Sequence, residues 1–222
     1  DLFWQISCFY NHCMNFLEKN GLKIFLFLFF AISYSITADA KKLLIFGDSI
    51  SAGYGIKESE NWVTLLENNL NKNSVFNYTL INSSVSGDTT SGGVSRIKKA
   101  LDTHLPDYVL IELGGNDALR GYPIAMIKEN LENIVSKVLE EKSKPILMQI
   151  KIPPNYGKRY VDAFENLYPI ISTNYNIPLI NFLLEDVALD QNLMQADGIH
   201  PNSKAQSIIA KQIKVEILNI IE

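Results

Sequence analysis

Short apolar runs alternate with longer amphipathic segments from Lys42 to the end of the chain. A short, continuous apolar run bounded by turn residues is typical of a buried strand, whereas apolar residues three or four positions apart are typical of a helix that covers a sheet. The pattern predicts five strands, over residues 42–46, 78–81, 108–113, 146–150 and 178–180. It predicts helices over residues 62–70, 92–101, 124–141, 160–175 and 202–221.

This alternation of strands and helices predicts the fold class. Parallel strands need a long crossover between them, and that crossover is usually a helix. We therefore expect a three-layer α/β/α domain around a parallel sheet. Residues 41–222 contain no long linker rich in Pro, Gly or Ser and no internal repeat, so they are expected to form one domain. In open parallel sheets the active site lies at the carboxyl ends of the strands, so residues directly after each strand are the first candidates for a functional role.

The first part of the chain, residues 1–40, has a different pattern and predicts an export signal. Lys19 and Lys23 precede the apolar run Ile24 to Ile32, and the segment ends in Ala38-Asp-Ala40. A basic region, an apolar region and an A-x-A site are the three parts of a secretory signal peptide. A transmembrane anchor is the alternative, but a span needs about 20 apolar residues. We expect cleavage after this segment and a periplasmic or secreted domain with no stable membrane anchor.

Met14 is a suitable start for such a signal, which makes residues 1–13 a candidate non-native upstream extension. Both cysteines, Cys8 and Cys13, lie in that extension. The expected mature domain, residues 41–222, therefore has no cysteine. This excludes a disulfide framework, a cysteine nucleophile and a lipid-anchored cysteine from its function.

Composition and charge add two limits. The 222 residues are 47% hydrophobic and 20% charged, which is ordinary for a globular domain with a full core. The formal net charge is -4, whereas nucleic-acid-binding domains usually carry a basic patch. We therefore expect no nucleic acid partner.

Ser49 is the candidate nucleophile. It directly follows the first predicted strand, in the sequence Gly47-Asp48-Ser49. A glycine before the serine permits a sharp turn, and a helix that begins there points free N–H groups at an anion. A serine hydroxyl is a weak nucleophile at neutral pH, so it needs a general base and donors for the oxyanion that it generates. The alternative is that Asp48 and Ser49 only cap a helix.

Two other strand ends carry candidate oxyanion donors. Gly87 follows the second strand, where a glycine can bring its N–H close to a ligand and where Asp88 or Thr89 can cap the next helix. Asn116, in Gly114-Gly-Asn-Asp117, follows the third strand and offers a neutral amide donor. Each segment is also explained as an ordinary turn.

His200 is the candidate general base. Of the two histidines after residue 40, His104 lies at the end of a predicted helix and is expected at the surface. His200 lies three residues after Asp197, a spacing that brings the carboxylate beside the imidazole. The carboxylate can then accept the Nδ1 proton and leave Nε2 to take the serine proton. Half of a metal site is the competing interpretation, but a third ligand at suitable spacing is missing from the sequence.

Taken in chain order, Gly-Asp-Ser, Ser-Gly-Asp, Gly-Gly-Asn-Asp and Asp-Gly-Ile-His resemble the SGNH (GDSL) hydrolase family. The resemblance extends from about Leu43 to the end of the chain. It is closest to the periplasmic bacterial group described as thioesterase I, lysophospholipase and arylesterase, through the stretches GDSISAGYG, VLIELGGNDALRG, ILMQIKIPPNYGKRY and MQADGIHPN. It implies a flavodoxin-like sheet of five parallel strands in the order 2-1-3-4-5.

The resemblance also implies roles for five residues. Ser49 becomes the nucleophile and, through its backbone N–H, the first oxyanion donor. The N–H of Gly87 and the side chain of Asn116 become the other donors. His200 becomes the general base and Asp197 the residue that orients it. The implied reaction passes an acyl group to Ser49 and then to water, and it requires no metal or organic cofactor.

The substrate is less determined by the sequence. We expect esters and thioesters of medium-to-long acyl chains; the alternatives are acetyl esters of carbohydrate or cell-wall material, or a non-catalytic periplasmic lipid-binding protein. Four apolar residues follow strand ends and are candidates for an acyl groove, although ordinary packing is the alternative for each: Leu119, Tyr122, Ile152 and Tyr156. We expect the protein to be a monomer.

Overall fold

A parallel sheet organises the part of the chain that the computed structural model describes, residues 40–72 and 77–221. Its strand order is β2-β1-β3-β4-β5, which confirms the predicted fold class and order. The predicted signal segment, except its last residue Ala40, and the upstream extension lie outside the described residues. The strands are β1 (Lys41–Gly47), β2 (Tyr78–Asn82), β3 (Tyr108–Glu112), β4 (Lys144–Met148) and β5 (Leu179–Ile180).

The middle residues of the central strands are apolar because helices cover both faces of the sheet. Ile45 of β1 pairs with Leu110 of β3, and Leu110 pairs with Ile146 of β4, and all three side chains are fully buried. The register also pairs Gly47 with Glu112 at the carboxyl ends of β1 and β3. The segments that follow these two strands therefore begin side by side.

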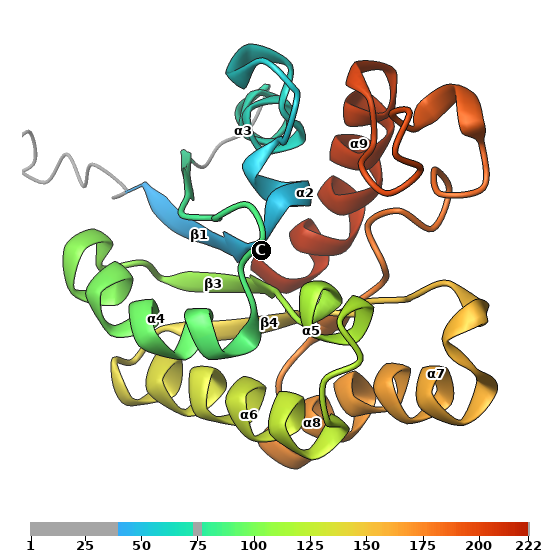
Figure 1. The fold of residues 1–222 in the computed structure, drawn as a ribbon. Coiled ribbons are helices and arrows are strands. Elements are labelled where there is room, and N and C mark those ends of the chain that lie inside the picture. The colour runs from blue at the N-terminus through green and yellow to red at the C-terminus, as the bar shows by residue number, and fades with distance from the viewer. Residues whose placement is uncertain (1–39, 73–76, 222) are drawn as a thin grey trace, which may run out of the picture. The chain divides into compact units, whose positions relative to one another are not determined.

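The helices form two outer layers (Figure 1). Helices α3 (Trp62–Asn71) and α9 (Ser203–Ile221) pack together on one face of the sheet. The other face is covered by α4 (Thr90–His104), α6 (Ile124–Glu140), α7 (Lys158–Glu165) and α8 (Leu167–Tyr175). The spacing that predicted them is visible in α6, which buries Ile127, Leu131, Ile134, Val135 and Val138.

The single helix predicted over residues 160–175 is wrong in one respect, because the structure divides it into α7 and α8 at Asn166. Pro169 lies in the first turn of α8 and has no N–H to donate to the carbonyl of Glu165. The side chain of Gln149 donates to that carbonyl instead, at 3.0 Å. A proline tolerated in the first turn of a helix thus explains why one amphipathic pattern gives two helices.

Short elements lie at the carboxyl ends of the strands. Helix α2 (Ser49–Ala52) directly follows β1, and α5 (Gly115–Leu119) follows β3 (Figure 1). In the described part of the chain, 3-10 turns cover residues 58–60, 154–156 and 191–193. The ranges 40–72 and 77–221 contain no helix with the length and apolar character needed to cross a bilayer.

Candidate active site

Ser49, His200 and Asp197 form a continuous hydrogen-bonded chain. The Ser49 Oγ lies 2.8 Å from Nε2 of His200, and Nδ1 of His200 lies 2.7 Å from Oδ2 of Asp197. The serine begins α2 after the first strand, and the other two residues lie in the loop before α9. This is the geometry that a serine nucleophile, its base and an orienting carboxylate require.

The carboxylate of Asp197 is held in place by its own loop. Its Oδ1 accepts hydrogen bonds from the backbone N–H of Ile199 at 2.9 Å and of His200 at 3.0 Å, so that Oδ2 faces the imidazole. The hydrogen bond from the His200 side chain, followed by those two N–H groups, lowers the pKa of Asp197 to about 2. Asp197 is therefore ionised at neutral pH and can accept the Nδ1 proton.

The turn that carries Ser49 contains a helix cap and also directs the serine hydroxyl toward His200. Asp48 caps α2, because its Oδ1 accepts the N–H of Ile50 at 3.0 Å. Ser49 does not serve as the cap; it is the first helical residue and its hydroxyl faces His200. Gly53 ends the helix after one turn with a φ of 75°, and its N–H donates to the carbonyl of Ser49. The candidate nucleophile thus lies on a tight turn closed at both ends.

Gly87 lies in an exposed turn next to the carboxyl end of β1. The N–H of Val85 donates to the carbonyl of Gly47 at 3.0 Å, and the N–H of Asp88 closes the turn onto Val85 at 3.1 Å. Gly87 has a φ of +77°, while a Cβ added there would meet nothing within 4 Å. The backbone conformation, and not a lack of space, therefore requires glycine at this position. Thr89, and not Asp88, caps α4.

Asn116 lies in the first turn of α5 and faces the turn that carries Asp48 and Ser49. Its Nδ2 donates to Oδ2 of Asp48 at 3.0 Å, which leaves the second hydrogen of the amide for another acceptor. The next residue, Asp117, is buried and accepts from both the N–H and the hydroxyl of Thr90, at 2.9 and 2.7 Å. These bonds join α5 to the start of α4.

A buried acid behind the turn that carries Ser49 was not identified from the sequence. Glu112 ends β3, is 1% exposed, and accepts from the hydroxyl of Ser51 at 2.7 Å and the N–H of Asp48 at 3.2 Å. Burial raises the pKa of Glu112 well above its usual range and the pKa of Asp48 to about 6. The signal in the sequence that could have identified Glu112 is a single charged residue at the end of an otherwise apolar strand.

Arg96 of α4 was also missed. Its guanidinium donates to Oδ2 of Asp88 at 2.6 Å, to the carbonyl of Gly47 at 3.1 Å and to the carbonyl of Ser83. The same group lies 3.7 Å from the centre of the Phe46 ring. One side chain thus joins the ends of β1 and β2 to the turn that contains Gly87.

The four residues predicted for an acyl groove have different environments. Leu119 and Tyr122 are half-buried, and Tyr156 is exposed. The Tyr156 hydroxyl donates to the carbonyl of Leu119 at 3.1 Å, so these two are brought together. Ile152 is 8% exposed and belongs to the core, which favours the packing interpretation for that residue. Their contact with substrate stays a prediction.

The remaining titratable candidates do not add a metal centre. His104 is the half-buried last residue of α4, at the helix end that the sequence predicted. Within the described residues, no group of three or more His, Cys, Asp and Glu side chains is arranged to hold a metal ion.

Comparison with known proteins identifies similar chains. A model of the GDSL-like Lipase/Acylhydrolase family matches residues 45–208. An arylesterase of Vibrio mimicus is 42% identical over 193 residues, which cover 87% of this chain and 96% of that protein. Thioesterase 1/protease 1/lysophospholipase L1 of Escherichia coli K12 is 42% identical over 184 residues, 83% of this chain and 86% of that protein. Among solved structures, the chain is similar to the psychrotrophic esterase EstA from Pseudoalteromonas sp., in a crystal structure inhibited by monoethylphosphonate. The two superpose with a TM-score of 0.78 at 40% sequence identity, and the match covers 81% of this chain and 97% of that one.

Proposed function

Because the chain belongs to the GDSL-like lipase/acylhydrolase family, we propose that it is a serine hydrolase in which Ser49, His200 and Asp197 cleave esters and thioesters of medium-to-long acyl chains. The observation that carries this proposal is the 2.8 Å hydrogen bond between the Ser49 hydroxyl and Nε2 of His200. It places a base where the serine proton must leave.

The first half of the proposed reaction acylates Ser49. Nε2 of His200 takes the hydroxyl proton as Oγ attacks the substrate carbonyl carbon, and the ionised Asp197 stabilises the imidazolium that forms. The tetrahedral oxyanion receives hydrogen bonds from the backbone N–H of Ser49, the N–H of Gly87 and the free amide hydrogen of Asn116. His200 then returns the proton to the alcohol or thiol as it leaves, and the acyl group stays on Ser49.

The second half releases the acid. His200 takes a proton from a water molecule, which attacks the acyl-Ser49 carbonyl, and the same three donors hold the second oxyanion. The proton returns from His200 to Oγ as the acid departs. Asp48 contributes through Asn116, because a carboxylate that accepts one amide hydrogen holds the other in a fixed direction.

Exposed apolar side chains beside the nucleophile favour a substrate with an apolar acyl or aryl group. Tyr54 is 54% exposed and its ring centre lies 4.6 Å from that of His200. Val85 is 49% exposed and its N–H bonds the carbonyl directly before the Asp48-Ser49 turn. Ile199, next to the base, is 48% exposed. An acyl chain would cover these groups, whereas a sugar would leave them in water. The names of the two curated relatives, arylesterase and thioesterase/lysophospholipase, support the same choice.

The test is kinetics on p-nitrophenyl esters of graded chain length, together with a palmitoyl thioester and a lysophospholipid. We expect kcat/KM to rise from acetate toward longer chains. A fluorophosphonate should label the wild-type protein and should not label Ser49→Ala. A maximum of kcat/KM at acetate would contradict the acyl-chain preference and favour the acetyl-ester alternative. Wild-type protein that resists labelling would overturn the hydrolase mechanism and favour lipid binding without catalysis.

We also propose that the domain formed by residues 41–222 is exported and acts as a monomer in the periplasm or outside the cell. The proposal is supported by the sequence pattern of residues 1–40 described above. Fractionation of cells that express the whole chain, followed by sequencing of the new N-terminus, tests it. We expect the enzyme in the periplasmic fraction with an N-terminus near Lys41, and one protomer by sedimentation. An uncleaved chain in the cytoplasm would contradict export.

A further inference from the structure

The hydrogen bond between Ser49 and His200 joins two segments that are 151 residues apart. We call residues 48–55 the nucleophile segment and residues 194–201 the histidine loop. Proximity catalysis is sensitive to small displacements, since a misplacement of a reacting group by about 1 Å can cost about 100-fold in rate. The two segments therefore need a direct connection besides the reacting groups themselves.

Gln195 supplies such a connection. Its side-chain Nε2 donates to the carbonyl of Tyr54 at 2.8 Å and to the carbonyl of Pro201 at 3.1 Å. Its backbone N–H donates to the carbonyl of His200 at 2.8 Å, and its own carbonyl accepts the N–H of Gly198 at 3.0 Å. We infer that Gln195 is a positioning residue that sets the alignment of His200 with Ser49, an inference that rests on the proposed function.

The connection to the nucleophile is short. The N–H of Tyr54, whose carbonyl Gln195 holds, donates to the carbonyl of Ser49 at 3.0 Å. Next to it, Gly55 has a φ of +72°, and a Cβ there would lie 2.7 Å from Oε1 of Gln195. The amide therefore packs directly against the backbone of the nucleophile segment. Ser49, Tyr54, Gln195 and His200 form a closed ring of contacts in which the catalytic hydrogen bond is one side.

The same hydrogen bonds also position the aromatic ring that lies against the His200 imidazole. The Tyr54 ring lies 4.6 Å from the His200 ring, at an interplanar angle of 39°. Since Tyr54 is more than half exposed, core packing does not hold its ring there. The hydrogen bond from Gln195 to the Tyr54 carbonyl fixes the backbone from which that ring extends. Gln195 therefore controls both the position of the base and the ring that shields it from water.

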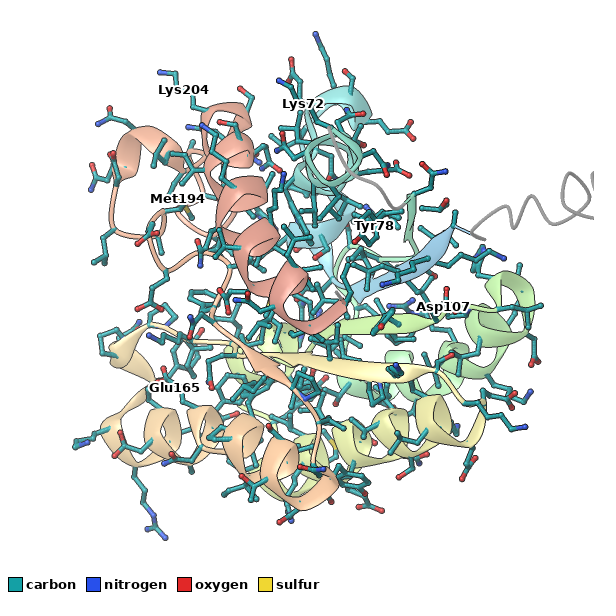
Figure 2. All side chains as sticks on the ribbon, turned by 180° about the vertical axis from the view of Figure 1, so that it is seen from behind. Lys72, Tyr78, Asp107, Glu165, Met194 and Lys204 are labelled. Atoms are coloured by element: carbon teal, nitrogen blue, oxygen red, sulfur yellow. The ribbon has the colours of Figure 1, made fainter. Side chains whose placement is uncertain are left out.

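Contacts that do not involve the Gln195 side chain hold the two ends of the histidine loop together. Met194, labelled in Figure 2 on the loop beside α9, pairs with Pro201 in an antiparallel bridge. Asn202 donates from Nδ2 to the carbonyl of Met194 at 3.1 Å and from its N–H to the carbonyl of Leu193 at 2.8 Å. Removal of the Gln195 amide should therefore release the loop from the nucleophile segment and leave the domain folded. Both hydrogens of that amide are already donated, so Gln195 acts through Tyr54 and His200 and is not a substrate donor.

The test is Gln195→Met, which keeps the length of the side chain and removes its donors. We expect kcat and the rate of fluorophosphonate labelling to fall together by about 10-fold to 100-fold, with KM changed less than about threefold. The proton NMR signal of the short bond between Nδ1 of His200 and Asp197 should broaden through exchange with water. Gln212→Met is the matched control. Gln212 lies on α9, and its Nε2 also donates to a backbone carbonyl, that of Phe182, at 3.0 Å. The control should keep wild-type kcat and labelling rate even if its Tm falls.

A second variant keeps the inference testable if Gln195→Met does not fold. Gln195→Glu presents a carboxylate to two carbonyl oxygens at neutral pH, and protonation restores one donor. Its labelling rate, divided by that of the wild type at each pH, should rise as the pH is lowered. Three outcomes would each overturn the inference. The first is a ratio of labelling rates that does not change with pH, and the second is a wild-type kcat in Gln195→Met. The third is an equal loss of kcat in Gln195→Met and Gln212→Met. Failure of the wild-type protein to be labelled would instead refute the proposed function.

Discussion

The side-chain amide of Asn116 donates a 3.0 Å hydrogen bond to Asp48, the residue directly before Ser49. The other oxygen of that carboxylate caps α2 through the N–H of Ile50. One buried side chain therefore orients both the helix that begins with the proposed nucleophile and the amide proposed to bind its oxyanion. Because β1 and β3 are paired, these two groups start from adjacent strand ends.

Asn116→Ala should lower kcat by roughly 10²-fold to 10³-fold, the usual cost of removing one oxyanion donor. KM should change little, because the donor acts mainly on charge that develops in the transition state. The measurement is steady-state kinetics on one preferred ester, with circular dichroism to confirm folding. A loss below about 10-fold would show that the side chain does not bind the oxyanion.

Asp48→Asn should make stability less dependent on pH. Burial raises the pKa of Asp48 from 3.8 to about 6, so ionisation is easier in the unfolded chain than in the native state. The native state therefore loses stability as the pH rises through this interval, up to about 3 kcal/mol at 1.36 kcal/mol for each unit. The asparagine variant does not titrate, so its free energy of unfolding relative to wild type should improve from pH 4 to pH 7.

Urea unfolding at several pH values measures this difference. Asp162→Asn is the control, because it removes an exposed carboxylate that is paired with Lys158 on α7 and should contribute little at any pH. A constant difference between Asp48→Asn and wild type would contradict a buried Asp48 that ionises near pH 6.

The sheet was predictable because the strands contain short, mostly apolar runs and the crossovers between them have a helical pattern. The proposed site was predictable because its groups sit in short local motifs at strand ends: Asp197 and His200 are three residues apart, and their geometry follows from one loop. The alternation of apolar runs does not determine the order of the strands, which was implied only by the family resemblance. The prediction of one helix over residues 160–175 was wrong because the effect of Pro169 depends on tertiary contacts. Pro169 leaves the carbonyl of Glu165 without a helical donor, and the sequence does not show that Gln149 supplies one.

The residues that the sequence did not reveal act through partners far away in the chain. Arg96 looks like any cation on a solvent-facing helix until the fold brings Gly47 and Ser83 to it. Gln195 is one polar residue in a polar loop, and only the tertiary structure places Tyr54 against its amide. A local sequence pattern contains no information about such distant contacts unless a residue departs from the pattern. Glu112 does so, because it is a charged residue in an otherwise apolar strand.

Asp197→Asn should lower kcat by about 10²-fold to 10⁴-fold. An asparagine oxygen can still accept the backbone N–H groups of Ile199 and His200, but a neutral amide does not stabilise the imidazolium. Since the pKa of Asp197 is lowered to about 2, this residue stays ionised at higher pH and any titration of wild-type activity above pH 4 belongs to other groups. The pH profile of kcat/KM checks this assignment. Activity within 10-fold of wild type in the variant would contradict the orienting role.

Arg96→Lys should lower the free energy of unfolding by about 1–3 kcal/mol and reduce kcat as well. The planar guanidinium reaches three acceptors from two strand ends and one turn while it stacks on the ring of Phe46, whereas an ammonium group on a single stem cannot reach all three. At least one of the three acceptors then loses this donor, and the turn that contains Gly87 is held less firmly to β1, although the backbone bond from Val85 to Gly47 remains. The matched control is Arg159→Lys on α7, an exposed position where the same exchange should change stability by less than about 0.5 kcal/mol. Equal effects of the two exchanges, measured by urea unfolding and by kcat on the same ester, would show that Arg96 does not join these segments.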